Sequence, residues 1–307
     1  MSPHRSAPRA GGGVPRVLVV YKKSSYEIYV RERHHARVLQ LLEDGDPSVD
    51  TLLHAHERHR EAMDVARKAL QGLGAKAVFR YRSGPVTVDD FDLIVTLGGD
   101  GTLLWASHRV GPDCPIVAIN TAPEHSVGHF CAAPAADIGD VLAEALAGRM
   151  QATRLARLAV SVDGEIVSTR VLNDMLFAHV CPASTTRLQL RLGELDAVYK
   201  SSGLWVSTAA GSTAAIRSSG GEVMPIGSRR LQFVVREPYR DPGRTDRMVT
   251  RGFIKPEQAL EVVSRIRAGR LYLDGPHTGM VIDIGSRLLI RLSEEPLTLL
   301  GFRGQDA

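Results

Sequence analysis

The sequence predicts an α/β fold in two parts: a doubly wound parallel α/β domain, followed by a β-rich, sandwich-like domain. Over about the first 150 residues, short runs of β-branched and aliphatic residues alternate with segments of helical apolar spacing. Such alternation is typical of a parallel sheet wrapped by helices. Beyond that point helical segments become rare, and short strand-like runs are separated by Gly, Asp, Asn or Pro. This second pattern is typical of antiparallel sheets.

In the first part, short apolar runs predict strands at residues 16–21, 77–81, 93–97 and 115–120. Longer segments with helical spacing cover residues 27–42, 51–73 and 135–146, and a further helix is expected to begin at Thr102. Ligands of such sheets bind beyond the carboxyl ends of the strands. Gly98 to Thr102 and Asn120 stand at such ends.

In the second part, strands are expected at residues 155–162, 166–177, 187–192, 197–208, 231–236 and 271–273. Two last candidates, 288–292 and 297–302, are expected to return to the first domain. The resulting division is a tail at 1–15, an α/β domain at 16–152, a β-rich domain at 153–285 and a returning segment at 286–307. The tail is rich in Pro and Gly without an amphipathic period, which predicts disorder.

Composition narrows the class of protein. With 44% hydrophobic and 23% charged residues, the chain of 307 residues is expected to be soluble and globular. No Lys/Arg block is interleaved with aromatic residues, so a nucleic-acid partner is not expected. No apolar run reaches the roughly 20 residues that span a bilayer, so no membrane association is expected. Cys114, Cys131 and Cys181 lie far apart, which predicts reduced thiols and a cytoplasmic protein.

The most informative motif is GGDGT at residues 98–102, between a buried strand and a helix start. This geometry brings bare backbone N–H groups up to a phosphate, and glycine leaves room for the close approach. Asp100 is unusual there because a carboxylate repels phosphate. Its place indicates chemistry, either holding Mg²⁺ or accepting a proton from an attacking hydroxyl. The alternative is a tight turn with Asp100 as a helix N-cap.

Two features of the β-rich part also indicate chemistry. Asn173 and Asp174 are poor strand formers inside a strand-like run, where a carboxylate can accept hydrogen bonds from a ribose diol. The alternative is a turn or a bulge. Residues 201–215, SSGLWVSTAAGSTAA, lead from a strand into a loop of hydroxyls and tiny side chains that admits a flat ring or a phosphate. A flexible linker is the alternative there.

Taken together and in this order, GGDGT, the Asn-Asp pair and the loop STAAGSTA resemble the NAD kinase family, with a likeness that covers residues 17–302. Gly128-His129-Phe130 resembles a Gly-x-Phe element of that family. The segments LNDMLFAHVCPA (172–183), SSGLWVSTAAGSTAA (201–215) and LQFVVREP (231–238) are similar to the plant-type NADH kinase branch. The resemblance implies a kinase that transfers the terminal phosphoryl group of ATP to the 2′-hydroxyl of the adenosine ribose of NAD(H), making NADP(H).

The resemblance also implies a role for each matching residue. Asp100 would be the catalytic base, and Asn173 with Asp174 would hold the ribose of the substrate. The phosphate-binding residues would be Gly98, Gly99, Gly101, Thr102 and Lys200. The further substrate-binding residues would be Ser202, Ala210, Ser212, Thr213, Ala214 and Ser218. No residue is assigned as a metal ligand, and Mg²⁺ is expected as the cofactor that accompanies ATP.

Departures from the family pattern concern the substrate. Asp174 is one methylene shorter than the commoner Glu, while Ala209 and Ala215 replace the usual Pro and Tyr. Ser202 stands where many members have an aspartate near the nicotinamide. Loss of that carboxylate changes how a charged oxidised ring and a neutral reduced ring are discriminated. These departures are shared with the NADH kinase branch, so they predict a preference for NADH.

Two rival functions remain open. A lipid kinase of the diacylglycerol or sphingosine type shares GGDGT but does not require the other two motifs. A non-catalytic NAD(H)-binding sensor would have little use for Asp100 beside phosphates. The family implies a homodimer or higher homo-oligomer, and inorganic polyphosphate is an alternative donor. His129, His179 and His277 are interpreted as surface or structural residues.

Overall fold

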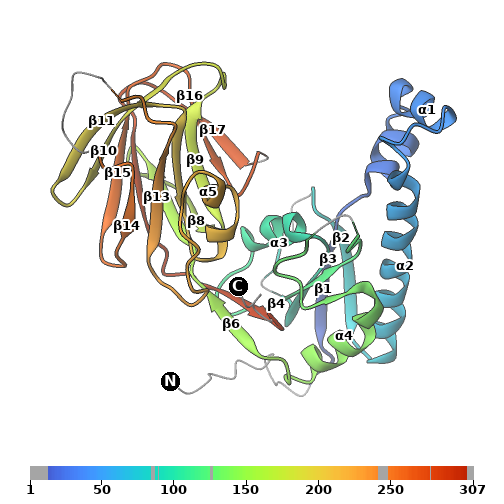
Figure 1. The fold of residues 1–307 in the computed structure, drawn as a ribbon. Coiled ribbons are helices and arrows are strands. Elements are labelled where there is room, and N and C mark those ends of the chain that lie inside the picture. Colours follow the sequence, from blue (N-terminus) through green and yellow to red (C-terminus); the bar gives the residue numbers. More distant parts are fainter. Residues whose placement is uncertain are drawn as a thin grey trace. The chain divides into compact units, whose positions relative to one another are not determined.

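The computed structural model describes residues 13–83, 87, 88, 90–124, 127–240, 248–276 and 278–302. It divides into two compact units, Met1–Thr153 with Thr298–Ala307, and Arg154–Leu297 (Figure 1). Most of the expected tail, and His277, lie outside the described residues. None of the described helices combines the length and the hydropathy that crossing a membrane requires.

The first unit is built on a sheet of mainly parallel strands in the order β2-β1-β3-β4-β19-β6, and β5 also pairs with β4. The pairs β1–β2, β1–β3, β3–β4 and β4–β19 are all parallel. Every residue of β3 and β4 is buried, as in central strands covered on both faces. The strands are β1 (Arg16–Tyr21), β2 (Lys76–Tyr81), β3 (Leu93–Gly98), β4 (Ile116–Asn120), β5 (Ala133–Pro134), β6 (Ala152–Leu155) and β19 (Leu297–Leu300).

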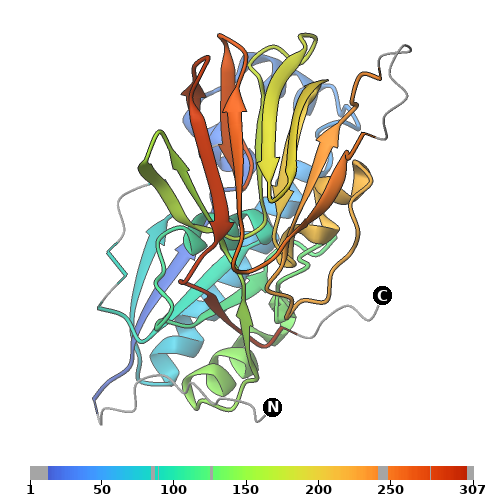
Figure 2. The ribbon, with the colours of Figure 1, turned by 90° about the vertical axis from the view of Figure 1, so that its left-hand side faces the viewer.

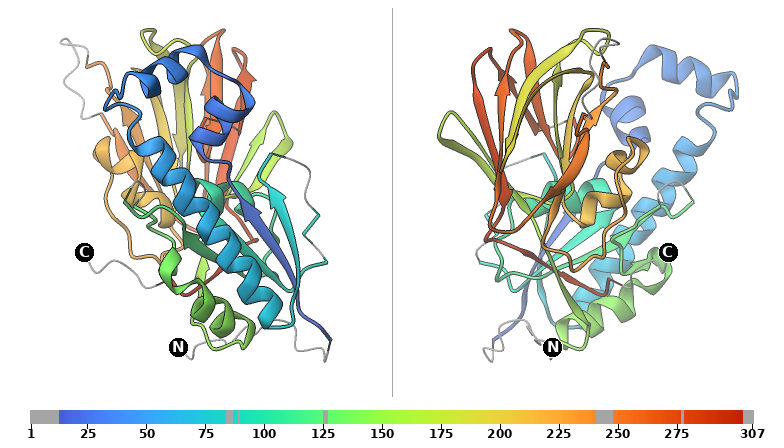
Figure 3. Two further views of the ribbon diagram at one scale, coloured as in Figure 1. Left: turned by 90° about the vertical axis from the view of Figure 1, so that its right-hand side faces the viewer. Right: turned by 60° about the vertical axis from the view of Figure 1, so that its left-hand side comes forward.

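Helices cover both faces of this sheet. On one face α2 (Thr51–Gly72) and α4 (Ile138–Leu146) lie side by side (Figure 3, left), where Leu70 and Leu142 pack into one core with strand residues such as Val95. On the opposite face lies α3 (Asp100–Ser107), which begins directly after β3 (Figure 1). The predicted doubly wound α/β architecture is therefore confirmed, as is the return of the C-terminal strand β19 to the first sheet.

The helix expected at residues 27–42 is two separate elements. A short π-helix, Glu27–Glu32, is followed by α1 (Ala36–Glu43). Between them His34 has a φ of 44°, in the left-handed region that a right-handed helix cannot continue through. The apolar spacing runs across this break, so periodicity alone did not reveal it. The helix expected at 135–146 also begins differently, with a 3₁₀ turn, Ala135–Asp137, before α4.

The second unit is a β-sandwich. Its described strands form two six-stranded sheets, in the orders β11-β10-β15-β18-β7-β8 and β14-β13-β12-β9-β16-β17. Figure 2 looks onto the first of these sheets. Along β18, exposed and buried residues alternate, so that one face of the sheet is apolar. Both sheets contribute to one buried core, for example Leu288 from the first and Phe233 from the second, and the sandwich prediction is confirmed.

The elements of this unit are β7 (Leu158–Val162), β8 (Glu165–Val171), β9 (Asp174–His179), β10 (Thr186–Leu192), β11 (Leu195–Ser201), β12 (Gly203–Ser207), α5 (Ala215–Ser218), β13 (Leu231–Arg236), β14 (Arg251–Ile254), β15 (Ala259–Ser264), β16 (Gly269–Leu273), β17 (Thr278–Ile282) and β18 (Arg287–Leu292). The strands β14, β15 and β17 were not expected from the sequence. Because β18 pairs with β7 and β15, the segment that returns to the first sheet is β19, not the whole of 286–307.

Two runs that were expected to form single strands are each divided into two. The run 166–177 overlaps β8 and β9, and the run 197–208 overlaps β11 and β12, whereas the run 155–162 begins at the last residue of β6 and contains β7. Both breaks fall at predicted site residues, Asn173 and Ser202.

Candidate active site

The turn Gly98–Thr102 joins β3 to α3 at the carboxyl edge of the first sheet. Its close packing explains the glycine at its start, because a Cβ on Gly98 would lie only 2.3 Å from Thr102 Oγ1. Thr102 is buried, and its Oγ1 has no hydrogen-bond partner among the described residues. The turn therefore combines closely packed glycine main chain with one buried hydroxyl that no described residue pairs with.

The carboxylate of Asp100 is held by two backbone groups from another segment. The N–H of His129 donates to Oδ2 at 2.9 Å, and the N–H of Phe130 donates to Oδ1 at 3.0 Å. Gly128 makes this possible, since its φ is +60° and a Cβ there would lie 2.4 Å from Asn120 Nδ2. The Gly-x-Phe element thus fixes Asp100 through main-chain bonds. Each carboxylate oxygen keeps a lone pair free to accept a proton or a cation.

Cys131 lies next to this element but is not a nucleophile. Burial first, and then the negative charge of Asp100, raise the pKa of its thiol to about 12. The thiol therefore stays protonated at neutral pH, and a protonated thiol does not attack. Asp100 therefore stays the predicted reactive group of the turn. His129 contributes its backbone N–H, and its ring packs 4.8 Å from that of Phe130, which is a structural role.

In the second unit, the Asn-Asp pair is held by a residue that the sequence did not single out. The carboxylate of Asp274 accepts the backbone N–H groups of Leu172 at 2.7 Å, Asn173 at 2.7 Å and Asp174 at 3.1 Å. In return, the N–H of Asp274 donates to the carbonyl of Asp174 at 2.9 Å. The only signal in the sequence was an Asp-Gly pair after a short strand, which is typical of an ordinary turn.

The environment of Asp174 favours its protonated form. Its side chain is buried, and burial first, then the charge of Asp274, raise the pKa of Asp174 to about 7. Near neutral pH the carboxyl is therefore divided between its two protonation states. Beside it, Asn173 Oδ1 is buried and has no partner in the described part of the chain, so it is an acceptor that is available to a ligand hydroxyl.

The hydroxyl-rich loop packs directly onto Asn173. A Cβ on Gly211 would lie 2.2 Å from the carbonyl oxygen of Asn173, which also accepts the Ser207 hydroxyl at 3.1 Å and the Thr208 N–H at 2.9 Å. The loop itself forms a 3₁₀ turn, Ala210–Thr213, followed by α5. These bonds exclude the flexible-linker interpretation, and they bring two motifs that lie about 35 residues apart into contact.

Not every loop residue is free to meet a ligand. The Ser212 hydroxyl donates to Ala209 O at 2.7 Å and accepts the N–H of Met224 at 3.0 Å, so its hydrogen bonds are used inside the loop. Ala210 is buried as well. In contrast, Thr213 and Ser218 are exposed and Ala214 is half-buried.

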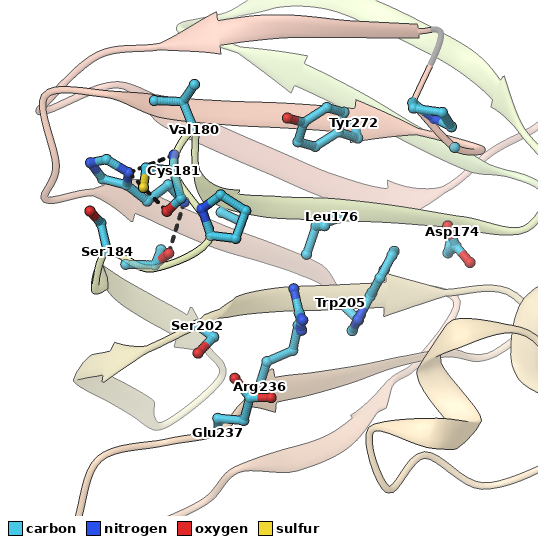
Figure 4. A pocket seen from close by; sticks show the side chains of 16 residues that line it. Asp174, Leu176, Val180, Cys181, Ser184, Ser202, Trp205, Arg236, Glu237 and Tyr272 are labelled. Carbon is cyan, nitrogen blue, oxygen red and sulfur yellow. Dashed lines mark hydrogen bonds between the residues drawn. The ribbon is translucent and has the colours of Figure 1, made fainter. Parts of the chain in front are cut away.

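A pocket of about 400 Å³ lies on the outer face of the second sandwich sheet (Figure 4). Because side chains alternate along a strand, Leu176, Trp205 and Tyr272 point away from the core and line it. Asp174 and Ser202, predicted from separate motifs, line it too. Lys200 is not among the lining residues, and its Nζ lies 5.8 Å from the centre of the Tyr239 ring.

Charged residues also border the pocket. The guanidinium of Arg236 lies 5.9 Å from the centre of the Trp205 ring, and Glu237 lines the same pocket. At its end, Cys181 donates its backbone N–H to His179 Nδ1 at 2.9 Å, so that this histidine has a structural contact. Trp205, Arg236 and Tyr272 were not predicted as site residues from the sequence. Their alternation with buried residues was the signal that they share an outward face.

Comparisons with known proteins found similar sequences and similar folds. Residues 16–150 match the model of the ATP-NAD kinase N-terminal domain. A "Probable NADH kinase" of Oryza sativa subsp. japonica is 36% identical over 263 residues, covering 78% of this chain and 80% of that protein. An NAD kinase from Archaeoglobus fulgidus, solved in complex with ATP, has a similar fold, with a TM-score of 0.66 at 21% identity over 94% of each chain.

A second solved structure, yeast NADH kinase complexed with NADH, has a TM-score of 0.63 at 17% identity, covering 94% of this chain and 84% of that chain. At these identities the two structures support the fold, whereas the rice relative supports the family. The resemblance that the motifs indicated is confirmed, and this chain belongs to the NAD kinase family.

Proposed function

We propose that this protein is an ATP-dependent NAD(H) kinase, which phosphorylates the 2′-hydroxyl of the adenosine ribose and makes NADP(H). The observation that carries the proposal is the Asp100 carboxylate, which two backbone N–H groups fix within the glycine turn of a chain of this family. A carboxylate so placed suits a reaction that removes a proton beside phosphates.

Asp100 acts as the general base. A ribose hydroxyl has a pKa far above that of a carboxyl group, so Asp100 does not ionise it in advance. Asp100 orients the hydroxyl and accepts its proton while the new oxygen–phosphorus bond forms and the bond from the γ-phosphorus to the bridging oxygen breaks, releasing ADP. The bonds from His129 and Phe130 keep the carboxylate in one orientation, so little reorganisation precedes the transfer.

The glycine turn holds phosphate groups. Gly99 and Gly101 are at least partly exposed and offer main-chain N–H groups, Gly98 lets the chain pack closely at the start of the turn, and no described residue pairs with the buried Thr102 Oγ1. Lys200 remains proposed as a phosphate contact, supported by the family match alone.

Magnesium is proposed to arrive bound to ATP, because Mg²⁺ in kinase sites keeps phosphate and water ligands. Asp100 offers oxygen atoms of the kind that Mg²⁺ prefers, and each accepts one N–H group from the described residues. When bound, the ion supplies positive charge that offsets the charge of the triphosphate.

The Asn-Asp pair holds the ribose. The Oδ1 of Asn173 and the carboxyl of Asp174 are acceptors for its hydroxyls. The carboxylate of Asp274 accepts the backbone N–H groups of both residues and so fixes their positions. Thr213, Ala214 and Ser218 are proposed to contact the adenosine. Ala210 and Ser212, which are buried, are proposed to shape the loop around it.

The pocket of Figure 4 is proposed to take the nicotinamide end, with a preference for the reduced ring. Trp205 and Tyr272 offer flat apolar surfaces, and Ser202 brings no carboxylate. An oxidised ring would carry its positive charge towards the Arg236 guanidinium, whereas the neutral reduced ring does not. Glu237 offsets part of this effect. The names of the rice and yeast relatives, both NADH kinases, agree with the preference.

The assembly and the location are also proposals. A homodimer or larger homo-oligomer follows the family expectation, and light scattering on the purified protein tests it. A cytoplasmic location is supported by the cysteines, all of which are free. Cell fractionation tests this second proposal.

Product analysis tests the activity. The purified protein is incubated with ATP, Mg²⁺ and NADH, and phosphorus NMR locates the added phosphate. We expect a 2′-phosphorylated dinucleotide and ADP in equal amounts. In parallel, diacylglycerol and sphingosine replace the dinucleotide. Phosphorylation of a lipid without phosphorylation of NADH would overturn the proposal in favour of the lipid kinase.

A further inference from the structure

Two cationic residues stand at the same sheet edge as the glycine turn. Lys22 follows β1 directly and Arg82 follows β2, while the turn follows β3. The N–H of Lys22 donates to Leu97 O at 3.4 Å, and the N–H of Arg82 donates to Tyr21 O at 3.1 Å. These bonds continue the parallel ladder by one residue. They therefore bring both cations to the carboxyl ends of three adjacent strands, where ligands of such sheets bind.

The two side chains approach the turn at different points. Lys22 Cδ lies 3.5 Å from the position that a Cβ on Gly98 would take, and Arg82 Nη1 lies 3.6 Å from the corresponding position at Gly101. Because neither glycine has a side chain, the side chains of Lys22 and Arg82 lie directly against the backbone of the turn. Any phosphate that meets the N–H groups of the turn is therefore within reach of two positive charges.

Neither cation has an anionic partner within the described part of the chain. Burial first, and then the charge of Arg82, lower the pKa of Lys22, and no carboxylate opposes this effect. The neighbouring Lys23 differs, because it pairs with Glu32 and lies over the Tyr81 ring at 4.8 Å. Two neighbouring positive charges repel each other, which is electrostatically unfavourable. A bound polyanion offsets this repulsion.

We infer that Lys22 and Arg82 bind the linked phosphates of the phosphoryl donor at the glycine turn. This inference rests on the proposed function, to which it adds a pair of donor-binding residues outside the GGDGT motif. A chain of linked phosphates carries enough negative charge to engage both cations at once, and Arg82 can bind a phosphate through two nitrogens. The same chemistry occurs in ATP and in inorganic polyphosphate.

Titration calorimetry tests the inference on the full-length protein without turnover. The variants are Lys22→Gln and Arg82→Gln, and the matched controls are Lys23→Gln and the exposed Arg80→Gln, each of which removes one positive charge nearby. The probes are ATP with Mg²⁺, tripolyphosphate with Mg²⁺, and NADH. We expect the first two variants to bind ATP about tenfold more weakly, as for the loss of a charged hydrogen bond. The dissociation constant of these variants for NADH should stay within about twofold of the wild-type value, and so should the dissociation constant of both controls for ATP.

The probes separate the two sources of phosphate. Equal weakening for ATP and tripolyphosphate assigns the cations to the phosphate chain in either donor. Weakening for ATP alone assigns them to a nucleotide donor. Lys22→Arg and Arg82→Lys keep the charge, so they should recover most of the affinity if the charge acts on the ligand, and they also control for folding.

Other results overturn the inference. It fails if Lys22→Gln and Arg82→Gln weaken ATP no more than the controls do, or if they weaken NADH instead. Failure of the proposed function gives a different result: wild-type protein that binds ATP through these cations but transfers no phosphate to NADH or NAD⁺.

Discussion

In the first unit the carboxylate of Asp100 is held by main-chain groups, whereas in the second unit the pocket is lined by side chains that alternate along several strands. Two backbone N–H groups orient Asp100, and the chain packs too closely at Gly98 and Gly128 to admit a side chain there. The pocket depends on Trp205, Tyr272 and Arg236, which can change without disturbing the sandwich core behind them. If the proposed function is right, the turn determines the reaction and the pocket determines the substrate, and substitutions in the two regions should have separable effects.

The largest effect is expected from Asp100→Asn. The amide cannot accept the proton, so kcat should fall by about 10³-fold or more, near the usual range for a lost general base. Because Asp100 lies in the turn and not in the pocket, the dissociation constant for NADH should change by less than about threefold. Initial rates and calorimetry check the two halves of this prediction. A variant that retains normal turnover would contradict the role of Asp100.

Gly211→Ala should weaken substrate binding by the second unit, at the loop that packs on Asn173, and leave the glycine turn unchanged. The added Cβ would lie 2.2 Å from the backbone oxygen of Asn173, which cannot move aside easily. We expect the KM for NADH to rise about tenfold or more and the protein to lose about 1–3 kcal/mol of stability, as in overpacked sites. The KM for ATP should stay within about twofold of wild type. Steady-state kinetics and urea unfolding measure these quantities.

Gly227→Ala is the matched control, because no atom lies within 4 Å of the Cβ that it adds. This variant should resemble wild type in both KM values. If Gly211→Ala and Gly227→Ala behave alike, the contact between the loop and Asn173 does not position the substrate.

Asp174 should make the stability of the folded protein depend on pH. Its pKa is 3.8 for an ordinary aspartate and about 7 in the folded protein. The folded state therefore holds the proton more tightly, so this contribution to stability is complete below about pH 4 and is lost as the pH rises through about 7. Asp174→Asn removes the titration. Relative to wild type, the free energy of unfolding of the variant should rise by roughly 2–4 kcal/mol between pH 4 and pH 8.

Urea unfolding of both proteins across this range checks the prediction. The pKa of His59, which burial lowers to about 4, acts in the opposite direction but is common to both proteins and cancels in the difference. An identical pH dependence in wild type and variant would show that Asp174 titrates normally.

The smallest effect is expected from Ser202→Asp. A carboxylate in the pocket attracts the positively charged oxidised ring, so the ratio of kcat/KM for NADH to that for NAD⁺ should fall about five- to tenfold, as for one partly exposed charge pair. Ser202→Asn adds similar volume without charge and should leave the ratio within about twofold. If both variants change the ratio equally, shape and not charge decides the preference.

Strand positions and the glycine turn were predicted best from the sequence, because they depend on local residue patterns. The strands β1 and β13 have the predicted bounds, and the glycine turn follows a central strand as expected, because glycine patterns and buried runs are local signals. The break at His34 was missed because a single residue with positive φ does not interrupt apolar spacing. Likewise, continuous strand-like runs concealed the breaks at Asn173 and Ser202, which the sandwich geometry imposes.

The candidate site shows the same limit. The predicted site residues were identified because each lies in a short sequence motif; they include Asp100, Asn173, Asp174 and Ser202. Asp274 lies 100 residues after Asp174, and only the pairing of β16 with β9 brings the two together. Trp205 and Tyr272 share a face for the same reason, since their strands both neighbour β9. Long-range sheet pairing of this kind has no local signature in the sequence.

Side-by-side initial rates with NADH and with NAD⁺, at saturating ATP and Mg²⁺, test the central claim most directly. We predict phosphorylation of both dinucleotides with a higher kcat/KM for NADH, because the pocket joins aromatic surfaces to a guanidinium and lacks a carboxylate at Ser202. A higher kcat/KM for NAD⁺ would contradict the proposed role of the pocket while leaving the kinase intact. No turnover of either dinucleotide would contradict the kinase assignment itself and favour a binding protein.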